Sequence, residues 1–257
     1  MNIIKNNFIS NFAGAWIFYT IFPKLPFINP KFKNIAQFAP FLGLIIGYIQ
    51  SLLYLLLKNN FWSTQASVSL CIVSGLLITG GMHADGLMDT IDGLYAGKKK
   101  MLKAMKDSRV GSFGVQAIIL IALIQFSALS RIDNKILFVL PISLFWGRFS
   151  NLIYIERYKY LNKKTKSISH KKYWRGIKKE ALLSLLLIPG IVIVYLLSIP
   201  STIDLSKYLL LLIAGAFFSI KVPLLLGNKV GGFNGDTCGA SILLTETIII
   251  FTYSVFL

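Results

Sequence analysis

The chain has 257 residues, of which 55% are hydrophobic and only 14% are charged, and its net charge is +17. A soluble domain carries about 25% charged residues, so these long apolar blocks exclude an ordinary soluble protein. A basic excess can indicate nucleic-acid binding, but basic loops beside anionic lipid explain it better in a membrane protein. The two cysteines, Cys71 and Cys238, have no metal-binding or disulfide spacing. From the apolar blocks and the basic excess we expect the lipid bilayer as a partner, and no nucleic acid.

A helix needs about 20 mostly apolar residues to cross a membrane. An early stretch, 8–28, is either a retained first span or a re-entrant segment, because prolines interrupt its end and no small-residue cleavage site follows. Seven further stretches qualify as spans: 36–57, 61–82, 112–130, 135–155, 181–200, 205–226 and 238–257. The expected fold is all-α, a single membrane domain over 1–257 with seven or eight transmembrane segments.

Basic residues fall unequally among the connections between these stretches. The connections on one side of the membrane hold only Lys58 and Arg131. Those on the other side hold nineteen Lys and Arg, in 29–35, 83–111, 156–180 and 227–237. Basic residues favour the cytoplasmic side, so we expect these four connections to be cytoplasmic.

The segment 80–93, where one expected span ends, is rich in glycine and aspartate. Asp85, Asp89 and Asp92 are spaced i, i+4 and i+7, which places their carboxylates within a roughly 60° arc of one helix face. The opposite face carries apolar residues, namely Leu87, Ile91 and Leu94. Such a helix presents three like charges together.

These carboxylates repel one another, and no basic residue lies among them. Carboxylate oxygens suit Mg²⁺, which takes one or two of them together with phosphate oxygens and water. A solvated acidic face is the alternative, but four of the ten acidic residues in the whole chain lie between Asp85 and Asp107. We therefore expect Asp85, Asp89 and Asp92 to bind Mg²⁺. His83 is either a general base or a hydrogen-bonded residue at the helix start.

Residues 98–106 interleave five lysines with the apolar Met101, Leu102 and Met105, a pattern typical of a basic helix on a membrane surface. Asp107, Ser108 and Arg109 follow, beside two glycines. Arginine binds phosphate through a bidentate fork. We expect this trio to contact phosphate.

A second glycine-rich segment, 231–239, joins the last two stretches. Asp236 and Thr237 open the final helix, where exposed backbone N–H groups favour an anion; an aspartate N-cap is the bland alternative. Three glycines let the backbone approach such a ligand closely: Gly231, Gly232 and Gly235. Because 80–93 and 231–239 lie at the same ends of their spans, we expect their helices to pack together and form one site.

Glu246 lies inside the apolar stretch 238–257. A carboxylate within a membrane is costly unless it is paired, so it marks a functional or partner-bearing position. Arg148 and Lys221 also lie within spans, and either could be its counter-ion.

Three segments together resemble the cobalamin synthase family, also called adenosylcobinamide-GDP ribazoletransferase. They are GGMHADGLMDTIDG at 80–93, MKDSRVGSFG at 105–114 and GGFNGDTCG at 231–239. Two positions depart from the family pattern: Ile21 stands where arginine is usual, which puts an N-terminal phosphate contact in doubt, and Asn234 replaces a commoner threonine. Chain length and motif order also fit.

The resemblance implies an enzyme of the bacterial cytoplasmic (inner) membrane that acts in the last steps of adenosylcobalamin synthesis. A ribose hydroxyl of α-ribazole, or of its 5′-phosphate, attacks the corrinoid-side phosphorus of adenosylcobinamide-GDP, and GMP leaves. Asp85, Asp89 and Asp92 would hold Mg²⁺, Arg109 would contact phosphate, and Asp236 would complete the metal site or orient the attacking hydroxyl. A homo-oligomer, or an assembly with other enzymes of nucleotide-loop synthesis, is a further expectation.

Two rival functions fit the residues less well. A CDP-alcohol phosphotransferase also uses an Asp-Gly-rich helix and Mg²⁺, but its signature needs Ala-Arg after the first Asp-Gly, where this chain has Leu87 and Met88. A cation transporter would place its carboxylates at the bilayer midplane. Here only Glu246 fits that expectation.

Overall fold

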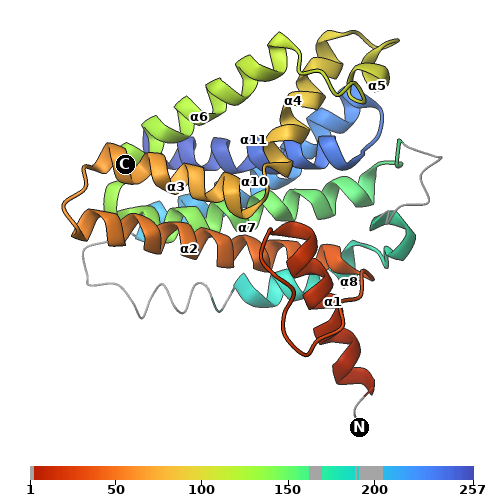
Figure 1. The fold of residues 1–257 in the computed structure, drawn as a ribbon, viewed down its shortest axis with the longest axis horizontal. Coiled ribbons are helices and arrows are strands. Elements are labelled where there is room, and N and C mark those ends of the chain that lie inside the picture. The colour runs from red at the N-terminus through yellow and green to blue at the C-terminus, as the bar shows by residue number, and fades with distance from the viewer. Residues whose placement is uncertain (1–2, 162–169, 189, 191–204) are drawn as a thin grey trace.

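The computed structural model describes residues 3–161, 170–188, 190 and 205–257. All regular elements in these ranges are helical, and the two termini lie far apart (Figure 1). The helices are α1 (Ile3–Tyr19), α2 (Ala39–Asn59), α3 (Thr64–Ile78), α4 (Met82–Tyr95), α5 (Met101–Ala104), α6 (Ser112–Ile132), α7 (Ile136–Arg157), α8 (Ile177–Glu180), α10 (Leu205–Val230) and α11 (Gly235–Val255).

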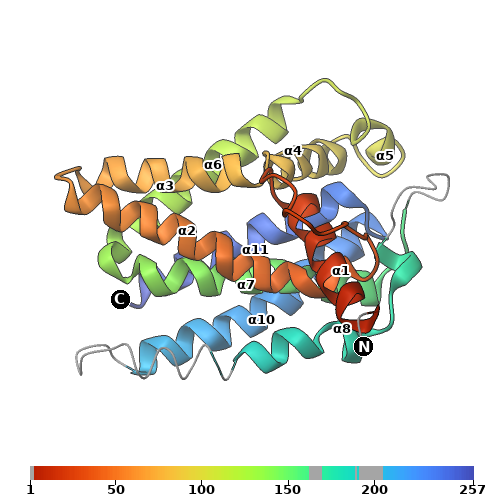
Figure 2. The same ribbon diagram turned by 60° about the horizontal axis from the view of Figure 1, so that its bottom comes forward.

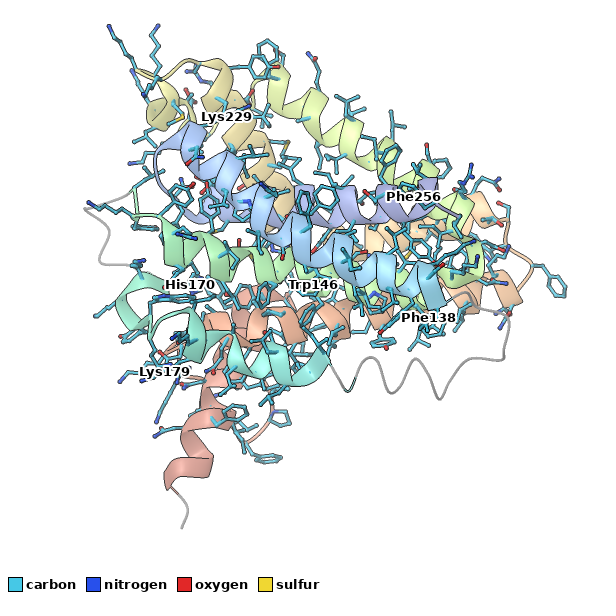
Figure 3. The ribbon with its side chains drawn as sticks, turned by 180° about the vertical axis from the view of Figure 1, so that it is seen from behind. Phe138, Trp146, His170, Lys179, Lys229 and Phe256 are labelled. Carbon is cyan, nitrogen blue, oxygen red and sulfur yellow. The ribbon has the colours of Figure 1, made fainter. Side chains whose placement is uncertain are left out.

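Helix α7 is the centre of the bundle. Most of its residues are buried, on every side of the helix, because α2, α10 and α11 pack against it (Figures 1 and 2). The closest approach is to α2, where a Cβ at Gly43 or Gly47 would overlap the backbone of Leu144 or Pro141. Small residues one turn apart let two membrane helices touch backbone to backbone. On the other side of α7, Trp146 fills the space that Gly215 leaves on α10 (Figure 3).

Within the described residues, four helical stretches are long and apolar enough to cross a membrane, or five if the bent pair α3–α4 counts as one. The four are Ile35–Asn59, Ser112–Arg157, Leu205–Val230 and Gly235–Val255. The 46-residue stretch Ser112–Arg157 is two helices, α6 and α7. The chain turns back between them at Asp133, whose φ is 50°. Long helices therefore occupy the expected segments 36–57, 112–130, 135–155, 205–226 and 238–257.

Two of the remaining expected segments differ, and the third is largely outside the described residues. In 8–28 the helix α1 ends at Tyr19, and the chain beyond it is irregular, so this segment is not one spanning helix. In 61–82 the helix α3 has only 15 residues. Most of 181–200 lies outside the described residues.

The expected basic surface helix at 98–106 is also different. Its only helical part, α5, is one turn long, and Met101 and Met105 are buried against Val230 of α10. A Cβ at Gly93 would overlap Met105, so α4 receives this methionine closely. The two methionines therefore pack inside the protein, while Leu102 and the lysines stay exposed.

The connections between α4 and α6 and between α10 and α11 lie at one end of the bundle, and α4 runs toward that end from its bend with α3 near the middle of the bundle (Figures 1 and 2). The turns from α2 to α3 and from α6 to α7 lie at the other end, with the C-terminus. This arrangement gathers both glycine- and aspartate-rich segments on the same side.

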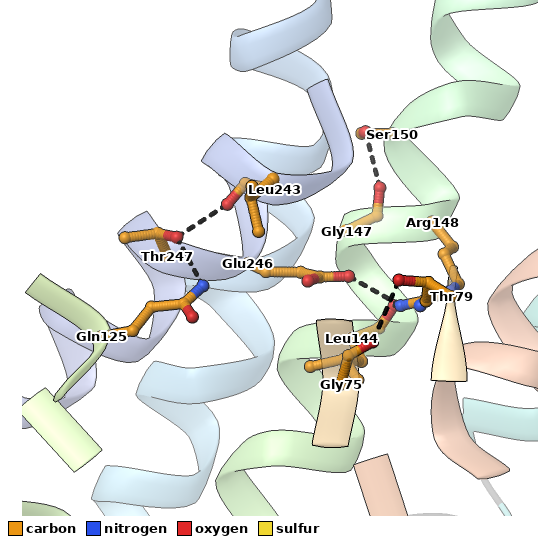
Figure 4. A network of polar contacts seen from close by, with 10 residues as sticks. All are labelled: Gly75, Thr79, Gln125, Leu144, Gly147, Arg148, Ser150, Leu243, Glu246 and Thr247. Atoms are coloured by element: carbon orange, nitrogen blue, oxygen red, sulfur yellow. Dashed lines mark hydrogen bonds and ion pairs between the residues drawn. The ribbon is translucent and has the colours of Figure 1, made fainter. Parts of the chain in front are cut away.

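The counter-ion of Glu246 is Arg148, in an ion pair buried between α7 and α11. Arg148 Nη1 lies 2.7 Å from Glu246 Oε1, and only 1% and 8% of the two side chains are exposed (Figure 4). A Cβ at Gly147 would overlap Glu246, so this glycine makes room for the carboxylate. Lys221 is exposed on α10 and lies over the ring of Phe217 instead.

This pair gives a prediction about stability. Removing one partner leaves an uncompensated buried charge, which costs about 3–5 kcal/mol, whereas replacing both by apolar residues can be neutral. Arg148→Met should therefore lower the melting temperature of the detergent-solubilised protein strongly. The double variant Arg148→Met/Glu246→Leu should recover most of the loss. A double variant as unstable as the single one would contradict the pairing.

Candidate functional site

The site begins at a sharp bend between α3 and α4. The two helices meet at 86°, and the turn consists of Gly80 and Gly81, with φ of 61° and 72°. Glycine adopts this left-handed conformation without the steric cost of a Cβ. The backbone N–H of Ile21 donates to the carbonyl of Ile78 at 2.8 Å, which ties the segment after α1 to the bend. The bend therefore turns the axis of α4 away from the axis of the apolar helix α3.

Helix α4 has the two faces that its sequence predicts. Leu87 is fully buried, whereas Asp85 is exposed and Asp89 and Asp92 are partly exposed. At 14 residues α4 is short of a membrane crossing. The aspartates of α4 therefore lie outside the four stretches that are long and apolar enough to cross a membrane.

Asp236 lies against α4, as the expected pairing of the two segments requires. A Cβ at Gly86 would come within 2.6 Å of the carbonyl oxygen of Asp236, and one at Gly239 would come within 3.1 Å of the carbonyl oxygen of Met82. A glycine on each helix thus allows direct backbone contact. The contact brings Asp236 beside the turn of α4 that carries Asp85 and Asp89.

The four aspartates interact electrostatically. Burial, followed by the charges of Asp85, Asp236 and Asp92 in that order, raises the pKa of Asp89 to about 6. Among the described residues no group of three or more His, Cys, Asp or Glu side chains is placed so that it could hold a metal ion. The donor set nevertheless fits Mg²⁺, which usually takes only one or two carboxylates and completes its shell with phosphate and water.

Asn234 positions Asp236. Its side chain accepts from the backbone N–H of Thr237 at 2.9 Å, and the Thr237 hydroxyl accepts from the backbone N–H of Asn234 at 2.9 Å. This reciprocal capping box fixes the start of α11. The Asn234 amide also donates to Asp236 Oδ2 at 2.7 Å. Asn234, rather than Asp236, is therefore the N-cap, and it holds the aspartate beside α4.

Asp92 binds the protein's own backbone. Its two oxygens accept from the N–H groups of Gly111 and Gly114, each at 2.8 Å. A Cβ at Gly114 would come within 2.6 Å of this carboxylate, and one at Gly111 would overlap it, so both glycines are needed. Because a carboxylate favours a helix N-terminus, Asp92 fastens the start of α6 to α4.

The segment before α6 presents an ion pair to solvent. Arg109 donates to both oxygens of Asp107, at 3.0 and 2.7 Å, and its own side chain is 87% exposed. These hydrogen bonds lower the pKa of Asp107 to about 2. Ser108 is exposed between them. The trio lies at the same end of the bundle as the aspartates, with Arg109 free to reach a ligand.

The three glycines of the second segment have different surroundings. Gly231, with φ of 80°, and Gly235 have open space where a Cβ would stand. Gly232 packs against the carbonyl of Lys159, and the backbone of Phe233 pairs with Lys159 and Leu161. Gly231 and Gly235 therefore leave room for a ligand, while Gly232 serves the contact with the chain after α7.

His83 lies on the buried side of α4. It is 6% exposed and lines a cavity of about 260 Å³ together with Gln50, Gln125, Arg148 and Glu246. Two residues along a helix correspond to a rotation of about 200°, so His83 points away from Asp85. The structure does not bring His83 together with the aspartates.

The fold and the site define a helical membrane protein with a carboxylate-rich site at one end of its bundle. The chain belongs to the CobS family, described as cobalamin-5-phosphate synthase, which matches residues 11–254. No solved structure is a significant match.

Relatives over nearly the full length carry one name, adenosylcobinamide-GDP ribazoletransferase. That of Prochlorococcus marinus strain SARG is 40% identical over 98% of this chain and 97% of its own. That of Trichormus variabilis is 33% identical over 93% and 94%, and that of Thermoanaerobacter pseudethanolicus is 34% identical over 84% of each.

The two hydrogen bonds of Asp92 predict an effect on the loop before α6. Asp92→Asn keeps one acceptor and sets an amide N–H against a backbone donor, so the segment 105–114 should loosen. Trypsin should then cleave after Lys106 and Arg109 faster than in the wild type. The matched variant Asp85→Asn, whose carboxylate is exposed, should be cleaved at the wild-type rate. Equal rates for Asp92→Asn and the wild type would show that Asp92 does not anchor the loop.

Proposed function

We propose that the chain joins adenosylcobinamide-GDP to α-ribazole, or to α-ribazole 5′-phosphate. A ribose hydroxyl forms a bond to the corrinoid-side phosphorus, the bond from that phosphorus to GMP breaks, and the hydroxyl proton is released. The products are adenosylcobalamin, or its 5′-phosphate, and GMP. The observation that carries this proposal is the contact of the Asp236 backbone with Gly86, beside the aspartate face of α4, in a chain of the cobalamin-5-phosphate synthase family.

Phosphoryl transfer depends mainly on positioning and on stabilising charge. Asp85 and Asp89 would hold Mg²⁺, which supplies positive charge at the diphosphate when bound. Asp92 keeps its two backbone hydrogen bonds and would support this pair by fixing the adjoining loop. These carboxylates have no basic neighbour on their helix face, which favours a cationic ligand.

The remaining residues would orient the substrates. Asp236, fixed by Asn234, would complete the Mg²⁺ site with Asp85 and Asp89 and so orient the attacking hydroxyl. Arg109 would contact phosphate through the N–H groups that Asp107 leaves free, since its guanidinium has five donors and the ion pair engages two side-chain N–H groups. Gly231 and Gly235 would let the backbone approach the diphosphate.

The same proposal covers membrane placement. Seven or eight crossings of the bacterial inner membrane, with the site on the cytoplasmic side, would agree with the excess of Lys and Arg in the connections at that end. The amphiphilic corrinoid would then meet the site at the membrane surface.

Substitution of the metal-binding carboxylates tests the reaction. Asp85→Asn and Asp89→Asn should each abolish cobalamin formation by the purified protein in lipid nanodiscs with Mg²⁺, because an amide is a much poorer Mg²⁺ ligand than a carboxylate. Asp133→Asn, at the opposite end of the bundle, should retain turnover. Near-normal turnover by both site variants at limiting Mg²⁺ would rule out the assignment. Formation of cobalamin and GMP by the wild type is the basic requirement.

A further inference from the structure

Two exposed aromatic rings stack on each other beside the site. Tyr95, the last residue of α4, and Phe113, at the start of α6, have ring centroids 3.9 Å apart and an interplanar angle of 7°. Although both side chains are large and aromatic, Tyr95 remains 65% exposed and Phe113 remains 44% exposed. The anchoring of Gly111 and Gly114 by Asp92 brings the two helix ends together. The stacked pair therefore presents a flat apolar surface to solvent. Packing in the core does not account for the stacking, because both rings are exposed.

The same rings line a cavity of about 510 Å³ with charged walls. Its lining includes Asp92, Asp107 and Arg109 as well as Tyr95 and Phe113. A ligand in this cavity would meet a planar aromatic face, a cationic fork and carboxylate acceptors at once. Planar heterocycles linked to phosphate have this combination of properties, because every nucleobase has a π-face for stacking.

We propose that this cavity is the nucleobase subsite, in which the guanine of the nucleotide substrate stacks on the Tyr95–Phe113 pair. The inference rests on the proposed function, since the nucleotide is the half of adenosylcobinamide-GDP that leaves. Tyr95 lies six residues after Asp89, which is about 9 Å along the helix axis. A ribose and its 5′-oxygen bridge a comparable gap between a phosphate held at Asp89 and a base held at Tyr95.

Asp107 gives the subsite its preference for guanine. The pyrimidine edge of guanine presents N–H donors at N1 and at the amino group, whereas adenine has an acceptor at N1. A carboxylate accepts only, and its two oxygens have about four lone-pair sites. Arg109 holds Asp107 in place with three hydrogen bonds, one from its backbone N–H and two from its side chain, which leaves about one lone-pair site for a guanine N–H. Arg109 stays available for the adjoining phosphate.

An aromatic anchor in the lipid interface is the competing role, because tyrosine gathers at membrane surfaces. Such an anchor needs neither a stacked partner nor a cavity lined by Asp92, Asp107 and Arg109. The two roles differ in what a ring-deleting substitution should change: nucleotide affinity or membrane attachment.

The test uses the full-length protein in nanodiscs with Mg²⁺, with GMP as the binding probe. Tyr95→Leu and Phe113→Leu keep an apolar side chain but remove the ring, so each should weaken GMP binding roughly five- to a hundredfold. The KM for adenosylcobinamide-GDP should rise in parallel, while the KM for α-ribazole stays unchanged. Tyr95→Phe, which keeps the ring, should bind GMP like the wild type, and AMP should bind the wild type more weakly than GMP.

Phe61→Ala is the matched control, because Phe61 is also an exposed aromatic residue but lies at the other end of the bundle. Unchanged GMP affinity in both ring-deleting variants, or an equal loss in Phe61→Ala, would overturn the subsite. Equal affinity of the wild type for GMP and AMP would overturn the role of Asp107. If the wild type forms no cobalamin, the proposed function itself fails. Normal wild-type turnover with unaltered GMP binding in the variants refutes the subsite alone.

Discussion

The close approach of α4 and α11 is the constraint on which the rest of the site depends. Gly86 and Gly239 have no side chain to separate the two backbones, and a Cβ at Gly86 would collide with the carbonyl of Asp236. Only at this separation does a carboxylate at the start of α11 join those on α4. The aspartates of one short helix then become part of a site made by two segments that lie far apart in the sequence.

Two further sets of contacts hold this crossing in place. Within the bundle, Arg148 and Glu246 connect α7 to α11 at a depth where an unpaired charge would be expensive. At the polar end, Asp92 binds the first turn of α6, and Asn234 caps α11 while bonding to Asp236. The site is therefore positioned by hydrogen bonds to backbone at its edges and by an ion pair beneath it. Its ligand-facing groups, Asp85 and Arg109, are left exposed.

The sequence predicted the features that depend on local periodicity. The spacing of Asp85, Asp89 and Asp92 located one face of α4, and five of the apolar stretches contain long helices. The sharing of one end by the two motifs followed from the distribution of Lys and Arg, and the structure confirms that they meet.

Features that depend on tertiary contacts were not predictable in this way. Asp92 has the same spacing as Asp85 and Asp89, and only the position of Gly111 and Gly114 distinguishes its role. Arg148 and Lys221 are equal candidates for Glu246 by sequence, and only the packing of the helices separates them. The cap at Asn234 does have a sequence signal, because asparagine is among the favoured N-cap residues. In the comparison with the family pattern, Asn234 is only a replacement of a commoner threonine, so its role as a cap was not predicted.

The central claim, that Asp236 and the aspartates of α4 form one cation site, can be tested by Mn²⁺ binding followed by electron paramagnetic resonance in the presence of GDP. The wild type should bind one Mn²⁺ per chain, and Asp236→Asn and Asp85→Asn should each weaken that binding. Loss of Mn²⁺ in Asp85→Asn with wild-type binding in Asp236→Asn would contradict the shared site.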